Sequence, residues 1–126
     1  NGGINFNPGY FLPTYEVIYL ICNPGFKLAP KANAQGDVWE IPQADDNPHP
    51  APFPVELAQR CIQSTSGGIV LDPLVGSGTA GIVALRNQRG FIGADVNARY
   101  VKMTRRRIIE DQPLFNAASE YQIRRR

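Results

Sequence analysis

In the second half of the chain, short continuous apolar runs alternate with stretches in which apolar residues recur every three or four positions. Residues 69–71 and 91–95 form runs bounded by Gly, Asp and Asn, so they predict two short strands. The stretches at 54–63, 79–87 and 98–112 have the helical spacing and predict three helices. Because a helix connects the two strands, they must run parallel, and the pattern predicts an α/β fold.

Local signals indicate where two of these helices begin. Pro54 ends a proline-rich stretch at residues 49–54 and suits the first position of a helix. Asn97 is placed as the N-cap residue of the last helix, and Pro113 would end that helix. The apolar stripes consist of Val55, Leu57, Ala58, Cys61 and Ile62 in the first helix and Tyr100, Val101, Thr104 and Ile108 in the last.

The first half of the chain is less regular. Its best strand candidate is the segment 10–22, whose β-branched and aromatic centre at 15–21 suits a strand covered on both faces. The Asn-Pro-Gly sequence at 23–25 predicts a turn after it. No period persists over 26–48, apart from one short extended patch at 36–42. Two strands alone would leave bare sheet edges, so we expect further strands, a tendency to self-associate, or both.

Composition limits the class of protein. The chain of 126 residues is 43% hydrophobic, enough for one ordinary domain or part of one. It has no run of about 18 apolar residues, so we expect no membrane-spanning segment. Cys22 and Cys61 match no metal spacing and predict two reduced thiols, no metal site and a cytoplasmic location.

Charge is distributed unevenly along the chain. Residues 1–48 carry two Lys against five acids, whereas residues 99–126 carry eight basic residues against three acids. The basic end is compatible with contact to a polyanion, and equally with a solvated helix face followed by a basic tail.

The stretch at 69–81 is the one on which a function depends. Gly76, Gly78 and Gly81 follow the first strand in a G-x-G-x-x-G pattern, and Asp95 ends the second strand. Taken literally, this is a dinucleotide fingerprint in which the acid binds ribose. Asp72, however, places a carboxylate at the tip of the first strand, where it would repel a pyrophosphate. S-adenosylmethionine carries an adenosine, an ammonium and a sulfonium without phosphate, and fits better. A simple turn at Asp72 and a dinucleotide site remain alternatives.

Three motifs carry a resemblance to a known family. Residues 49–54 (His-Pro-Ala-Pro-Phe-Pro), 72–79 (Asp-Pro-Leu-Val-Gly-Ser-Gly-Thr) and 91–95 (Phe-Ile-Gly-Ala-Asp) resemble consecutive motifs of the amino-group DNA methyltransferases in the β motif order. Segments at 15–20 and 36–42 are also similar, so the resemblance covers about residues 11–108. It implies a partial Rossmann-like fold with a mostly parallel sheet and flanking helices, typical of S-adenosylmethionine-dependent methyltransferases.

The resemblance also implies a cofactor, a partner and a set of site residues. The cofactor is S-adenosyl-L-methionine, and the partner of the full-length enzyme is double-stranded DNA, methylated at adenine N6 or cytosine N4, with a prokaryotic or viral origin. Asp72 and the turn at 76–79 would hold the methionine portion, and Asp95 would bind the ribose. The proline stretch at 49–54 would close over the methionine end. The implied cofactor-binding residues are Pro50, Ala51, Pro52, Phe53, Asp72, Pro73, Gly76, Ser77, Gly78, Thr79 and Asp95. Leu74 and Ala80 depart from the Phe and Thr usual in the family, and we expect altered contacts there rather than a lost site.

The catalytic motif of the family is missing. That motif has Asp, Asn or Ser followed by Pro-Pro and an aromatic residue, and no Pro-Pro dipeptide occurs in this chain. The Asn-Pro-Gly sequences at 7–9 and 23–25 are better explained as turns. The chain begins with Asn1, and its only methionine is Met103. We therefore expect the carboxy-terminal part of such an enzyme, without a catalytic residue and inactive alone.

We expect this part to divide into four segments. These are a strand-bearing remnant at 1–25, a loop-rich segment at 26–48 with a possible target-recognition role, a cofactor-binding half at 49–112 and a basic tail at 113–126. A fragment of an NAD-type oxidoreductase and a noncatalytic adenosine- or DNA-binding module are the alternative functions.

Overall fold

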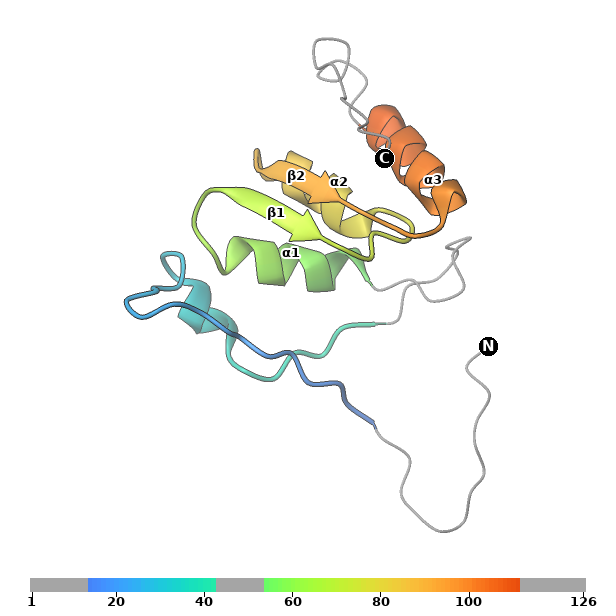
Figure 1. Cartoon of the computed structure of the whole chain (residues 1–126). Helices are drawn as coiled ribbons and strands as arrows, with labels where there is room; N and C mark the ends of the chain where they lie inside the picture. The colour runs from blue at the N-terminus through green and yellow to red at the C-terminus, as the bar shows by residue number, and fades with distance from the viewer. Residues whose placement is uncertain (1–13, 43–53, 112–126) are drawn as a thin grey trace, which may run out of the picture.

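A computed structural model describes residues 14–42 and 54–111. Its regular elements follow one another as a short 3-10 helix, a helix, a strand, a helix, a strand and a long helix (Figure 1). Their bounds are η1 Ala32–Gln35, α1 Val55–Gln63, β1 Ile69–Asp72, α2 Thr79–Arg86, β2 Gly90–Gly93 and α3 Ala98–Asp111. The predicted α/β order of the second half is confirmed.

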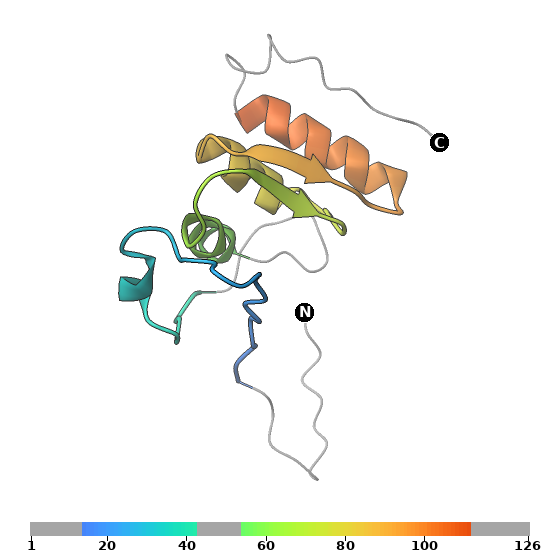
Figure 2. The same ribbon diagram turned by 60° about the vertical axis from the view of Figure 1, so that its left-hand side comes forward.

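The two strands form a parallel pair. Ile69 lies opposite Gly90 and Asp72 opposite Gly93, so the carboxyl ends of both strands lie at the same edge of the sheet. The helix α2 makes the crossover between them (Figure 2). The strand positions predicted from the apolar runs are correct to within two residues, because Gly and Asp mark the ends of each run.

The core lies between α2 and its neighbours. Val83 and Ala84 in α2 are completely buried, and Ala58 and Ile62 of α1 pack against them. From the sheet, Val70 and Phe91 pack on this cluster. Side chains alternate across a strand, so β1 and β2 turn one face toward these helices.

The other face of the sheet is exposed. Ile69 and Leu71 of β1 are 65% and 66% exposed, and Ile92 of β2 is 54% exposed. Within the part of the chain that the structure describes, this face of the two-stranded sheet is therefore uncovered. Large apolar side chains left in water favour association with another surface.

The prediction of a strand at 15–21 is wrong. No strand is present there, and its side chains are open to solvent, from Tyr15 at 78% exposed to Ile21 at 91%. A β-rich sequence becomes a strand only against a pairing partner, and the described residues offer this segment none. The turn at 23–25 is confirmed, since the Phe26 N–H donates to the Asn23 carbonyl at 3.1 Å. The predicted extended patch at 36–42 is likewise not paired with another strand.

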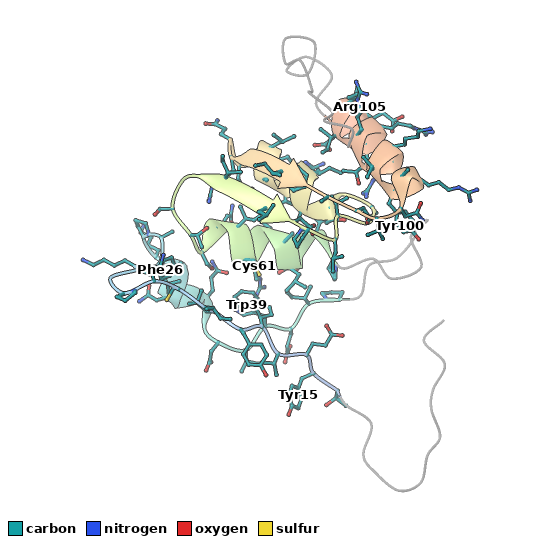
Figure 3. All side chains as sticks on the ribbon, in the orientation of Figure 1. Tyr15, Phe26, Trp39, Cys61, Tyr100 and Arg105 are labelled. Atoms are coloured by element: carbon teal, nitrogen blue, oxygen red, sulfur yellow. The ribbon has the colours of Figure 1, made fainter. Side chains whose placement is uncertain are left out.

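A few contacts connect residues 14–42 to α1. The Ala29 N–H donates to the Ser64 carbonyl at 2.9 Å, just after α1 ends. The Trp39 ring lies beneath the Arg60 guanidinium at 5.6 Å, on the α1 side that carries Cys61, whereas Tyr15 lies farther out (Figure 3). The segment is thus joined to α1 by the backbone bond at Ala29 and the ring contact at Trp39.

The helices differ in how they begin. Pro54 is the N-cap of α1 rather than its first helical residue, with an extended ψ of 142°, so that prediction is wrong by one position. Asn97 does cap α3, because its Oδ1 accepts the Arg99 N–H at 3.0 Å. Pro113 lies outside the described residues. Among the helices that are described, none is long and apolar enough to cross a bilayer.

Candidate functional site

The glycine turn, residues 75–78, lies between β1 and α2, at the carboxyl end of the sheet. Its chain reversal is closed by the Gly78 N–H, which donates to the Val75 carbonyl at 2.8 Å. Gly76 and Gly78 both have positive φ, at 48° and 86°, which residues with a Cβ rarely adopt. Gly78 is also the N-cap of α2 and offers no capping side chain. The first amides of α2 are therefore available to a ligand acceptor.

Asp95 joins the end of β2 to this turn. Its Oδ2 accepts the Gly76 N–H at 3.0 Å, and its Oδ1 accepts the Asn97 N–H at 2.8 Å. A backbone hydrogen bond also joins the end of β2 to the turn: the Val75 N–H donates to the Ala94 carbonyl at 2.8 Å. A carboxylate offers about four lone-pair sites, so Asp95 keeps acceptor capacity for hydroxyl groups of a ligand. The sequence indicated a ribose ligand here and missed the structural role.

Asp72 forms a simple turn, the alternative to ligand binding that the sequence left open. Its Oδ1 accepts the Leu74 N–H at 3.0 Å, the pattern of an Asx turn. Its own carbonyl accepts the Ala94 N–H at 2.9 Å, which holds the ends of β1 and β2 together. In the described part of the chain its Oδ2 has no hydrogen-bond partner. Turn formation and ligand binding are therefore compatible at this carboxylate, and the neighbouring Leu74 is 77% exposed.

Ser77 and Thr79 face the protein rather than solvent. They are only 6% and 3% exposed, and their hydroxyl oxygens lie 3.3 Å apart. Any contact that these two residues make with a ligand would therefore come from the backbone. Pro73, by contrast, is exposed at the strand tip. The remaining predicted site residues, Pro50, Ala51, Pro52 and Phe53, lie outside the described part of the chain.

Two residues of α3 that the sequence reasoning missed contact the turn. The Thr104 hydroxyl donates to the Gly76 carbonyl at 3.0 Å, and Arg107 Nη1 donates to the Ser77 carbonyl. Thr104 is buried, and its methyl group occupies the space that a Cβ at Gly78 would need. The available signal was their spacing of three residues, which places Arg107 on the same side of the predicted helix as Thr104.

The described part of the site contains acids but no metal-ligand cluster. Among the described residues, no three His, Cys, Asp or Glu side chains lie close enough together to hold a metal ion. The shifted pKa values lie elsewhere: the hydrogen bond that Arg86 donates to the Asp111 carboxylate raises the pKa of Arg86, and burial raises the pKa of Cys61. The arrangement offers carboxylates for hydroxyl or cationic groups and backbone amides for a small anion.

The chain matches one protein family and several individual proteins. A sequence model of the family described as DNA methylase matches residues 3–106. DNA adenine methyltransferase YhdJ of Escherichia coli (strain K12) is 41% identical over 80 residues, which are 58% of this chain and 27% of that protein. Type II methyltransferase M.HpaI of Haemophilus parainfluenzae is 36% identical over 91 residues, or 67% of this chain and 29% of that protein.

The crystal structure of TTHA0409 from Thermus thermophilus, complexed with S-adenosyl-L-methionine, resembles this fold with a TM-score of 0.56. That alignment has 28% identity and covers 87% of this chain and 50% of the other. The chain thus spans less than a third of the length of the two curated relatives above.

Proposed function

The chain belongs to the DNA methylase family, and on that premise we propose that it forms the cofactor-binding part of a DNA methyltransferase. The reaction moves a methyl group from S-adenosyl-L-methionine to the exocyclic amine of adenine, at N6, or of cytosine, at N4. The substrate is double-stranded DNA in the cytoplasm. The observation that carries the proposal is the joining of Asp72, the glycine turn and Asp95 at one edge of a parallel sheet.

The charges of this edge favour S-adenosyl-L-methionine over a dinucleotide. A pyrophosphate at the turn would approach two carboxylates, those of Asp72 and Asp95, and like charges repel. S-adenosyl-L-methionine has no phosphate and brings two positive centres of its own. Membership of the DNA methylase family also disfavours the oxidoreductase alternative.

Each part of the site has a role in this proposal. Asp95 accepts hydrogen bonds from the ribose hydroxyls. It uses the carboxylate lone pairs that the Gly76 and Asn97 N–H groups do not occupy. The Asp72 Oδ2, which has no hydrogen-bond partner among the described residues, faces the positively charged methionine end. The amides of the glycine turn and of the start of α2 receive the methionine carboxylate. The stretch 50–53 closes over the same end, a role that rests on the family resemblance alone.

The chemical half of the reaction is assigned to no residue of this chain. An enzyme that methylates a base takes it out of the stack and holds it by its polar edge and its aromatic face. The Pro-Pro motif with its following aromatic residue, which would supply these groups, does not occur in the sequence. We therefore propose that this chain binds the cofactor and that the groups that hold the base come from outside it.

Radiolabelled S-adenosyl-L-methionine tests both halves of the proposal. The purified chain, irradiated with tritiated cofactor, should become labelled, and S-adenosylhomocysteine should prevent the labelling while NAD should not. The same cofactor incubated with plasmid DNA and the chain should leave the DNA unlabelled. Protection by NAD would contradict the cofactor assignment. Methylation of DNA by the pure chain would show that the catalytic groups are present in it.

A further inference from the structure

We infer that Thr104 and Arg107 are positioning residues for the cofactor turn, acting through its backbone without touching the cofactor. The inference rests on the proposed function for the identity of the ligand. Its structural content is independent, because it concerns how α3 holds the turn. Of the three consecutive carbonyls from Val75 to Ser77, the first is bonded within the turn and the other two are bonded by α3.

A turn with glycine at two of its four positions needs such support. Glycine has the largest range of backbone conformations, so Gly76 and Gly78 can take the required positive φ but do not by themselves keep it. The conformation therefore depends on bonds from outside the turn. Asp95 supplies one bond at the Gly76 N–H, and α3 supplies the two at the carbonyls.

The Thr104 bond fixes the direction of one amide. A peptide group is planar and trans, so its N–H points opposite to its carbonyl. The Gly76 carbonyl points toward Thr104 on α3, and the Ser77 N–H of the same peptide is therefore directed away from α3. That N–H has no partner among the described residues. If this peptide rotated, the Gly76 carbonyl oxygen would take the place of the Ser77 N–H beside the methionine carboxylate. A hydrogen-bond donor would then be replaced by a group that repels the carboxylate.

Arg107 is distinguished from the two arginines that precede it. Arg105 projects from α3 into solvent (Figure 3), and Arg106 bonds to Glu110 in the next turn at 2.8 Å. Arg107 instead donates to the Ser77 carbonyl, 30 residues away in sequence. Asp111 is paired with Arg86, and in the described part of the chain Arg107 makes no ion pair. A charged donor makes a stronger bond to a carbonyl than a neutral one.

Four variants of the 126-residue chain test the inference. Thr104→Val removes the hydroxyl and keeps the shape, whereas Thr104→Ser keeps the hydroxyl. Arg107→Gln removes the second tether. Thr65→Val is the matched control away from the turn, because it deletes a similar hydroxyl-to-carbonyl bond, from Thr65 to Ile62 at 3.1 Å. It also removes the oxygen that accepts two longer bonds from Arg89. Affinity for S-adenosyl-L-methionine is measured by calorimetry, and amide exchange at residues 76–78 by NMR.

Thr104→Val and Arg107→Gln should each weaken binding about three- to tenfold, the effect of one hydrogen bond, and should speed amide exchange at the turn. Thr104→Ser should stay within about twofold of the wild type, and Thr65→Val should not change the affinity. Unchanged affinity and unchanged exchange in Thr104→Val would overturn the inference. If Thr104→Val does not fold, Arg107→Gln and Thr104→Ser decide by the same two measurements.

A wild-type chain that binds no S-adenosyl-L-methionine would refute the proposed function. The amide-exchange comparison would then still decide whether α3 holds the turn, because it needs no ligand. The two failures are therefore distinguishable.

Discussion

Gly78 is the position at which the contact between the glycine turn and α3 can be tested most sharply. The substitution Gly78→Ala adds one methyl group to a residue whose φ is 86°. Its Cβ would lie 2.6 Å from the Thr104 Cγ2 and 2.9 Å from the Thr104 Oγ1. Real Cβ atoms do not approach other heavy atoms this closely, so the turn, α3 or both must move.

The expected cost has two parts. A residue with a Cβ in the left-handed region costs about 1–2 kcal/mol relative to glycine. Forcing a methyl group into packed surroundings costs about 1–3 kcal/mol more. We therefore expect Gly78→Ala to lower the free energy of unfolding by about 2–5 kcal/mol, a large share of the stability of a small domain.

Gly68 provides the matched control within the same chain. Its φ of 84° is nearly that of Gly78, but a Cβ there would meet nothing within 4 Å. Gly68→Ala should therefore show the conformational part alone, about 1–2 kcal/mol. The difference between the two variants measures the overlap with Thr104. Adding Thr104→Ser to Gly78→Ala removes the Cγ2 and should recover part of that difference.

The assay is urea unfolding followed by circular dichroism, with all variants at one protein concentration. An unchanged slope against urea would show that the variants unfold the same structure. Equal losses for Gly78→Ala and Gly68→Ala would refute the packing of α3 against the turn. The same result would weaken the inference that Thr104 positions this turn.

Three further predictions concern other parts of the molecule. Asp95→Asn should weaken S-adenosyl-L-methionine binding at least about tenfold in calorimetry, because an amide replaces a charged acceptor, and an unchanged affinity would exclude the ribose role. Cys61, whose pKa burial raises, should react with iodoacetamide at pH 8 more slowly than the exposed Cys22, as followed by mass spectrometry, and urea should remove the difference. Since its folded pKa is the higher one, the stability linked to Cys61 is complete below about pH 8.5 and is lost as the pH rises through the folded pKa. Leu71→Lys should reduce the self-association that we expect of the exposed sheet face, measured by sedimentation velocity, and a monomeric wild type would contradict it.

The second half of the fold could be predicted because its signals are local. Gly, Asp and Asn bound each apolar run, and Asn97 caps α3 through its own side chain, so the strands and helices are predictable to within about two residues. The first half could not be predicted in the same way. Residues 15–21 have a strand composition, but strand formation depends on a neighbour that local sequence does not reveal.

The candidate site shows the same division. Asp95 and the glycine turn are recognisable from their spacing, and the structure brings them into contact through the Gly76 N–H. Thr104 stands out in the sequence only as part of an apolar stripe, because its bond to Gly76 spans 28 residues. The sequence predicts that the Asp72 carboxylate faces a ligand. In the structure its Oδ1 accepts the Leu74 N–H, two residues away. The bond within the turn leaves the Asp72 Oδ2 without a partner among the described residues, so the ligand role stays a prediction.

Calorimetric titration of the 126-residue chain with S-adenosyl-L-methionine, and separately with NAD, tests the assignment of the glycine turn most directly. Two carboxylates beside the turn favour a ligand without phosphate, so we expect saturable binding of S-adenosyl-L-methionine and no heat with NAD. Binding of NAD at equal or higher affinity, or no binding of S-adenosyl-L-methionine, would contradict that assignment.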